Sequence, residues 1–211
     1  MKLKALFENG NILNKEIARK IISDCQPYLQ EIQYDVDNFR LHRGLVLDSF
    51  KRRAKEVAEN VYMADVRKDR VPLNTPQYLH TFIDNWMNEK LGAKFRSSSI
   101  FCAPNYHMVL SFGKPYVILP IGEFKYAWSP FIEDLYSDVE EISFASKEDD
   151  DQAKSKIADV LENAKYRTDG IRTAMREYPK HEIMVECDSY YAFEVNTFDN
   201  YFCPLYDLVS K

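Results

Sequence analysis

Residues 182–195 read EIMVECDSYYAFEV, and this stretch decides the fold class. Its apolar and aromatic residues form two short blocks, 183–185 and 190–193, which polar residues separate. Short apolar runs bounded by turn residues are typical of strands. We therefore predict that Glu182–Glu186 and Tyr190–Val195 form a terminal pair of strands.

Other periodic stretches lie between this pair and the N-terminus. Residues 39–47 alternate and then become continuously apolar, which predicts a strand that enters the core. Further strands are predicted at 57–66, 97–103, 116–120 and 124–128, and helices at 14–29, 76–90, 106–111, 130–136, 152–164 and 171–177, with Thr75 as the N-cap of the second helix. Strands near both ends, with helices between them, favour an α+β fold of mixed, mainly antiparallel sheets with flanking helices. With no internal repeat or linker, we expect a single domain over residues 1–211.

The composition excludes several classes of protein. The chain has 211 residues, 45 % of them hydrophobic, and a net charge of -5, so it can bury a core and lacks the basic character of a nonspecific nucleic-acid binder. It has no apolar run of the ~20 residues that a membrane span needs. The first ten residues are too short and too charged for a signal peptide, and the four cysteines form no CxxC pair. We expect a cytoplasmic protein with reduced, buried cysteines and no membrane partner.

A local basic groove remains open as an alternative. Two clusters of cationic residues lie close in sequence: Lys51, Arg52 and Arg53, then Arg67, Lys68 and Arg70. They are either a solvated face or a groove for a nucleic-acid strand. In the second case the protein would modify nucleic acid, and its binding would depend strongly on salt.

Arg43 and Gly44 stand inside the apolar strand predicted at 39–47. A buried guanidinium is costly unless an anion or a carboxylate meets it, so Arg43 is either a structural salt-bridge partner or a phosphate-binding group. In the second reading, Gly44 allows a ligand to approach the backbone closely.

Three consecutive hydroxyls, Ser97, Ser98 and Ser99, begin another apolar strand. Alternation along a strand puts Ser97 and Ser99 on one face. They are either a plain strand edge or turn, or part of a binding site. Glu182 stands at the mouth of the strand at 182–186, where a carboxylate can act on a ligand at the sheet edge. Strands also often begin with a charged residue that has no such role.

Taken in chain order, these three pieces resemble the arginine–serine–glutamate signature of ADP-ribosyltransferases. The stretch 182–195 is similar to the last hairpin of that family, with an apolar triplet after the glutamate and an aromatic-rich return strand. The stretches 67–80 and 113–134 also resemble a pattern found in bacteriophage-encoded proteins, which implies a viral protein in the host cytoplasm.

The resemblance implies an ADP-ribosyltransferase-like fold and a mono-ADP-ribosyltransferase that cleaves NAD, its co-substrate. Loss of nicotinamide creates an oxocarbenium-like ribose, which a carboxylate stabilises electrostatically. The implied catalytic residues are Glu182, Ser97 and Arg43, with Ser97 orienting Glu182. The implied NAD-binding residues are Arg43, Gly44, Ser97, Ser99 and Tyr106, the last by stacking on the nicotinamide ring.

One position departs from the family. Lys180 stands two residues before Glu182, where many members carry Glu or Gln that helps to select the acceptor. The acceptor is therefore an unidentified protein or nucleic acid, and an arginine side chain is disfavoured. The alternative is a non-catalytic viral accessory or inhibitor protein that binds a host macromolecule. No metal is expected, because His80 and Asp84, four residues apart on one helix, have no evident third ligand.

Overall fold

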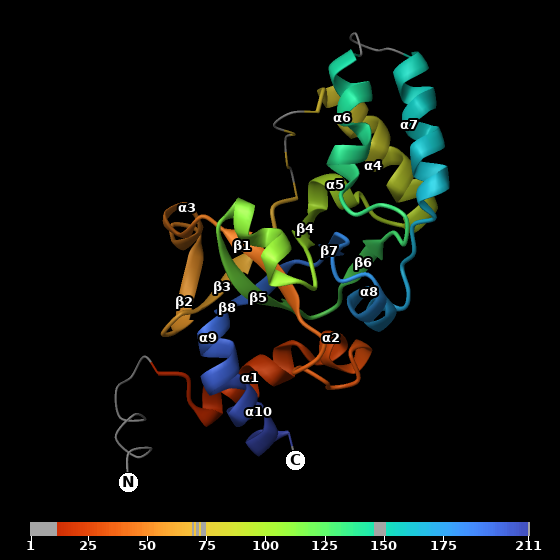
Figure 1. Cartoon of the computed structure of the whole chain (residues 1–211). Coiled ribbons are helices and arrows are strands. Elements are labelled where there is room, and N and C mark those ends of the chain that lie inside the picture. The colour runs from red at the N-terminus through yellow and green to blue at the C-terminus, as the bar shows by residue number, and fades with distance from the viewer. Residues whose placement is uncertain (1–11, 69, 71, 73–74, 146–150, 211) are drawn as a thin grey trace. The chain divides into compact units, whose positions relative to one another are not determined.

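The computed structural model describes residues 12–68, 70, 72, 75–145 and 151–210. Within these ranges the protein is a mixed α+β structure with two antiparallel sheets and flanking helices, as predicted (Figure 1). It divides into two compact units, Met1–Asp65 with Asn105–Phe124 and Cys187–Lys211, and Val66–Pro104 with Lys125–Glu186. We call them the five-stranded and the three-stranded unit, after their sheets. Each unit is assembled from separate stretches of the chain. That residues 1–211 form a single domain stays a prediction.

The five-stranded unit has a sheet of strand order β1-β5-β8-β3-β2, in which every neighbouring pair is antiparallel. Its strands are β1 (Leu41–Leu45), β2 (Ala54–Ala58), β3 (Val61–Asp65), β5 (Lys114–Ile121) and β8 (Ser189–Glu194). Its helices are α1 (Lys15–Asp24), α2 (Gln26–Glu31), α3 (Leu47–Lys51), the 3₁₀ helix η2 (Tyr106–Phe112), α9 (Val195–Thr197), the π-helix η3 (Phe198–Phe202) and α10 (Cys203–Val209).

The helix predicted at 14–29 is divided in two. Asn14 caps α1, because its side chain accepts hydrogen bonds from the backbone N–H groups of Glu16 and Ile17. Cys25 interrupts the helix, and Pro27 lies in the first turn of α2 rather than marking an end. A proline fits the first turn because its missing N–H would have no partner there.

The strand predicted at 57–66 is instead a hairpin. β2 and β3 pair with Ala58 opposite Val61, so Glu59 and Asn60 form a two-residue turn. Asn60 has φ of 60°, a left-handed conformation that asparagine tolerates better than most residues. The turn signal was therefore present in the sequence, but without the glycine that usually accompanies it.

The three-stranded unit has the strand order β4-β7-β6, again antiparallel. Its elements are α4 (Gln77–Leu91), α5 (Phe95–Ser98), β4 (Ser99–Cys102), β6 (Lys125–Trp128), α6 (Leu135–Ala145), α7 (Asp151–Ala164), α8 (Ile171–Glu177) and β7 (Ile183–Glu186). Helices α4, α6 and α7 lie side by side (Figure 1) and bury Leu79, Ile83, Val139, Ile157 and Leu161 in one core, which also contains Ala127 and Met184 from the sheet.

The predicted terminal strand pair does not form. β7 belongs to the three-stranded sheet, whereas β8 lies at the centre of the five-stranded sheet between β5 and β3. β5 and β6 likewise enter different sheets after Gly122, whose φ is 67°. Strands that are apolar on both faces carry no pattern that selects a partner, so adjacency in sequence was a poor guide.

Three local predictions are also wrong. Thr75 does not cap α4, because Pro76 occupies the N-cap position and no side-chain hydrogen bond is made there. The helix predicted at 130–136 begins only at Leu135. The strand predicted at 97–103 begins at Ser99, because residues 95–98 form the short helix α5.

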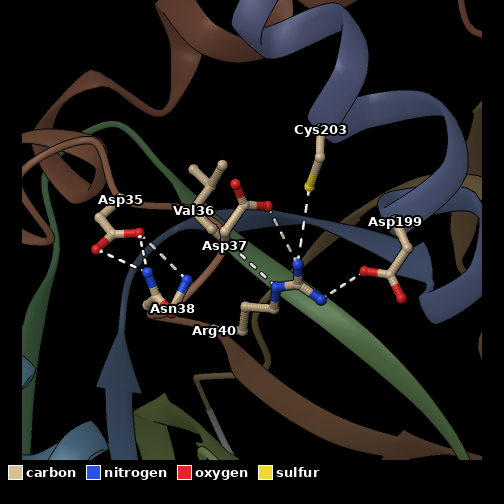
Figure 2. A network of polar contacts seen from close by, with 7 residues as sticks. All are labelled: Asp35, Val36, Asp37, Asn38, Arg40, Asp199 and Cys203. Carbon is tan, nitrogen blue, oxygen red and sulfur yellow. Dashed lines mark hydrogen bonds and ion pairs between the residues drawn. The ribbon is translucent and has the colours of Figure 1, made fainter.

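Arg40 ties the segment before β1 to the C-terminal helices (Figure 2). Its Nε donates to the Val36 carbonyl at 3.0 Å, and its two terminal nitrogens reach the Asp199 and Asp37 carboxylates. The Cys203 Sγ lies 3.9 Å from the guanidinium. Burial raises the pKa of the Cys203 thiol to about 12, so this cysteine stays neutral although a cation adjoins it.

All four cysteines lie within the described ranges and are buried thiols outside any disulfide, as expected. None of the helices within the described ranges is long and apolar enough to cross a membrane.

Candidate functional site

The residues predicted to form the site are divided between the two units. Arg43 and Gly44 lie on β1, and Tyr106 begins η2, all in the five-stranded unit. Ser97, Ser99 and Glu182 belong to the three-stranded unit. That the two groups meet in one cleft stays a prediction.

The surroundings of Gly44 explain why a glycine stands there. A Cβ at this position would lie 2.2 Å from the Val109 carbonyl oxygen and 2.9 Å from the Cβ of Phe112, both on η2. The close approach that Gly44 permits is therefore made by η2 and not by a ligand.

Tyr106, at the start of η2, is 42 % exposed. Its ring packs on the His107 ring with 4.0 Å between centroids, and edge-on to the His42 ring with 6.2 Å between centroids.

The serine hydroxyls close the helical turn of α5. The Ser98 Oγ donates to the Lys94 carbonyl at 2.8 Å, and the fully buried Ser99 Oγ donates to the Phe95 carbonyl. The Ser97 Oγ donates to the Asp84 carboxylate. Serine commonly makes such short-range bonds to the backbone, so a helical turn accounts for the hydroxyls of Ser98 and Ser99, and Asp84 accounts for that of Ser97.

Ser97 and Glu182 lie at opposite ends of the β4–β7 pair. Ser99 is opposite Glu186 and Cys102 is opposite Ile183, so Ser97 precedes one end and Glu182 the other. Four residues of strand span about 13 Å. The structure therefore does not bring Ser97 to Glu182.

Other polar residues gather around β7, which Glu182 directly precedes. Alternation along β7 places Met184 and Glu186 on one face, and Phe101 on β4 is opposite Met184. Two guanidinium groups lie over the Phe101 ring, with the Arg70 Cζ at 4.9 Å and the Arg96 Cζ at 5.3 Å from its centroid.

A lysine lies at the Glu186 end of the same face. The Lys68 Nζ is 3.2 Å from the Glu186 carboxylate, and both side chains are partly exposed. We call Lys68, Arg70, Arg96, Phe101 and Glu182 the arginine face.

The backbone around Arg96 is fixed by a buried carboxylate. Asp84 Oδ1 accepts hydrogen bonds from the backbone N–H groups of Arg96 at 2.9 Å and Ser97 at 3.2 Å. The His80 Nε2 lies 3.5 Å from the Asp84 carboxylate. Burial lowers the pKa of His80, the Arg96 charge lowers it further, and the Asp84 charge opposes both effects. Ser97 thus helps to hold Arg96 in place through Asp84.

Tyr166 approaches the arginine face from the side of β6. Its ring packs against the core that contains Met184 and Ala127. Burial raises the pKa of the Tyr166 phenol, the Glu182 charge raises it further, and the Arg96 charge lowers it. The acidic residues Asp134 and Asp138 add to the negative charge around it.

The segment before α6 fixes the start of β7. The Glu182 N–H donates to the Glu133 carbonyl at 2.8 Å, and the neighbouring His181 Nδ1 lies 2.8 Å from the Ser129 carbonyl oxygen. The Glu182 backbone is thus anchored, as a residue that must act on a ligand requires.

This arrangement can bind an anionic ligand beside a carboxylate. Each of the two guanidinium groups that contact the Phe101 ring is a planar donor that matches a carboxylate or a phosphate. No group of three His, Cys, Asp or Glu side chains within the described ranges could hold a metal ion.

Sequence reasoning overlooked Arg96, Phe101 and Tyr166. Arg96 directly precedes the serine triplet, and an arginine next to three hydroxyls was a usable signal. Nothing in the local sequence distinguished Phe101 or Tyr166 from ordinary core aromatics. Comparison of the chain with protein-family models, with curated proteins and with solved structures gives no match.

Proposed function

We propose that this protein is an NAD-dependent mono-ADP-ribosyltransferase with its active site on the arginine face. One observation carries the proposal: the Arg70 and Arg96 guanidiniums lie over Phe101 on β4, which pairs with β7, the strand that Glu182 directly precedes. A dinucleotide offers a pyrophosphate for the two cations and flat rings for aromatic contacts. The five-stranded and three-stranded antiparallel sheets are compatible with an ADP-ribosyltransferase-like fold.

In this proposal Arg70 and Arg96 bind the pyrophosphate, the role that the resemblance gives to Arg43. Glu182 faces the ribose. As the bond to nicotinamide breaks, positive charge develops on the ribose, and the carboxylate stabilises that charge more than it stabilises the ground state. The acceptor, a protein or nucleic-acid nucleophile, then attacks the cationic carbon. Lys180 is exposed at the position that often helps to select the acceptor.

The test measures nicotinamide release and NAD binding on the same variants. Glu182→Gln is nearly isosteric, so it should keep NAD affinity and lose roughly 10²–10³ in turnover. Arg96→Gln should instead weaken NAD binding about tenfold or more, because a hydrogen bond to a charged group is lost.

Two matched variants serve as controls. Glu186→Gln removes a carboxylate at the far end of β7, about 13 Å away, and Arg176→Gln removes an exposed cation of the same unit. Both should behave as wild type. Equal losses of turnover in Glu182→Gln and Glu186→Gln would show that the wrong carboxylate was chosen. Wild-type protein that releases no nicotinamide, with or without protein and nucleic-acid acceptors, would overturn the proposal.

A second candidate function is favoured by a different observation. Four side chains of η2, together with Val46, are apolar and exposed: Tyr106, Met108, Leu110 and Phe112. Contiguous exposed apolar side chains often mark a surface that binds another protein. They favour the non-catalytic binding protein, which predicts no NAD cleavage in the same assay.

A further inference from the structure

The five-stranded unit contains a hollow of about 120 Å³. Three separate stretches of the chain meet there: the residues before α1, the turn between β2 and β3, and the segment formed by α9 and η3. They line the hollow with Ile12, Leu13, Glu59, Asn60, Thr197 and Tyr201. Because one water molecule takes up about 30 Å³ of the liquid, the hollow has room for a group of several heavy atoms.

The walls of this hollow are part of the folded core. The Asn60 N–H donates to the Glu56 carboxylate at 3.2 Å, and the Asn60 carbonyl accepts from the Glu194 N–H at 3.0 Å. Leu13 and Thr197 are buried. The hollow is therefore preformed, as binding sites for small ligands usually are.

Tyr201 reaches the hollow from the π-helix η3, in which the Cys203 N–H donates to the Phe198 carbonyl five residues earlier. π-Helical turns are rare, and they occur frequently at functional sites. The other two aromatic side chains of η3, Phe198 and Phe202, are buried in the core, whereas Tyr201 is 44 % exposed. An exposed phenol ring beside a hollow offers its face to a cation.

Glu59 gives the hollow a negative charge. It is exposed in the β2–β3 turn, and among the described residues no hydrogen bond or ion pair engages its carboxylate. The Glu56 carboxylate, which accepts from the N–H of the residue after Glu59, adds a second negative charge nearby. None of the six lining residues is a cation. The hollow thus combines aliphatic side chains, an aromatic ring and a carboxylate that is available to a ligand.

We propose that this hollow binds a cationic group at the end of an aliphatic chain, the chemistry shared by a lysine or arginine side chain and by a free amine. Glu59 pairs with the cation, and the Tyr201 ring contacts it. The aliphatic part of the ligand packs on Ile12 and Leu13, as the stems of long cationic side chains do on apolar surfaces. The site is independent of the proposed function, and its test requires no NAD.

A pair of matched probes tests the proposal by ¹H–¹⁵N NMR titration. n-Butylammonium carries the cation, and 1-butanol is a neutral molecule of nearly the same shape. We expect n-butylammonium to shift the amide signals of Glu59, Asn60 and Tyr201 and to bind about tenfold more tightly than 1-butanol, because the alcohol makes neither the charged contact nor the contact between cation and ring. Equal affinities for the two probes, or no shift of these signals, would overturn the proposal.

Variants of the two lining groups identify the site. Glu59→Gln should weaken n-butylammonium binding about tenfold, with an unchanged melting temperature, since the carboxylate bonds no described residue. Tyr201→Leu keeps an apolar side chain without the ring and should weaken binding about threefold. Asp207→Asn, which removes an exposed carboxylate of α10, is the matched control and should have no effect. Equal losses in Glu59→Gln and Asp207→Asn would reveal nonspecific attraction by an acidic protein and overturn the site.

Further probes distinguish the two sources of this chemistry. The Nα-acetyl amides of lysine and arginine represent the side chain of a partner protein, and putrescine represents a free amine. Tighter binding of either amide assigns the hollow to a protein partner, and tighter binding of putrescine assigns it to a small amine. Binding of none of the three contradicts the proposal.

Discussion

The role of Gly44 had two possible explanations until its neighbours in the structure were known. A glycine beside an arginine in an apolar strand suggested a close approach by a ligand. The structure fills that space with η2, and Gly113 at the end of η2 has the same function, since a Cβ there would lie 2.6 Å from the Leu45 carbonyl oxygen. Both glycines allow a short helix to lie directly against β1. A sequence shows that a side chain is absent, but not what occupies its place.

This explanation makes a prediction for Gly44→Ala. The added methyl group would overlap the Val109 carbonyl, so β1 and η2 must separate, and we expect a loss of about 1–3 kcal/mol in the free energy of unfolding. Thermal and urea unfolding measure the loss. Val46→Ala, an exposed neighbour on the same stretch, should change stability little. An unchanged melting temperature in Gly44→Ala would support the ligand reading instead.

The serine triplet makes the same point for hydroxyl groups. Three adjacent serines at the start of an apolar run are unusual, and the resemblance assigned two of them to NAD. In the structure their hydroxyls bond Lys94, Phe95 and Asp84, and so close the turn that leads into β4. Asp84 is seven residues before the end of α4 and far from the triplet in sequence. No local pattern therefore predicted that its carboxylate accepts a hydrogen bond from Ser97.

At the scale of elements, Arg40 fastens the C-terminal helices to the segment before β1. The guanidinium bonds Asp199 of η3 and lies 5.1 Å from the ring centroid of Phe198, which packs in turn against Phe193 of β8. The C-terminal helices were overlooked in the sequence, although Phe198, Phe202, Leu205 and Tyr206 have the i, i+4, i+7, i+8 spacing of a helix and are all buried. Their stability comes from packing of the aromatic residues and from this arginine.

We predict that Arg40→Gln loosens η3 and α10. Several partly buried hydrogen bonds are lost, and the remaining carboxylates have no cation, which should cost about 1–3 kcal/mol. Hydrogen exchange of residues 198–209 should accelerate more than exchange of β5 or β8, since the clamp acts on the helices. Arg19→Gln, an exposed cation on α1, is the control. Uniform acceleration across the unit, or none, would contradict a local clamp.

The element types were easier to predict than their partners. The helix predicted at 171–177 has those bounds in the structure, the one at 152–164 begins one residue earlier, and the one at 76–90 is displaced by one residue at both ends. Capping, apolar periodicity and flanking prolines are local signals, and they are sufficient for helices of this kind. The pairing of β7 and β8 was wrong because pairing depends on residues far away in the chain.

At the scale of the whole molecule, buried His80 links stability to pH. Burial holds the pKa of the folded imidazole below the 6.5 of the unfolded chain. As the pH falls through 6.5, the unfolded chain takes up a proton that the folded protein resists, so acid favours unfolding. The contribution of His80 is complete above this pH and declines below it.

The prediction is a difference between two proteins. From pH 7.5 to pH 5, the free energy of unfolding in urea should fall more for wild type than for His80→Gln, which cannot be protonated. Subtracting the two curves removes the other histidines and the carboxylates. Parallel curves would mean that the His80 imidazole is as easily protonated in the folded protein as in the unfolded chain.

The sequence by itself was sufficient to predict the α+β fold class of the protein. The positions of most helices and strands follow from hydrophobic pattern and turn chemistry, which act over a few residues. Only the tertiary structure decided which strands share a sheet, how the chain divides into two units, and that Arg70 and Arg96 lie over Phe101. These features depend on contacts between residues tens of positions apart. The free energy of these contacts is gained only when whole helices and strands pack together. It therefore cannot be predicted from any short stretch of sequence.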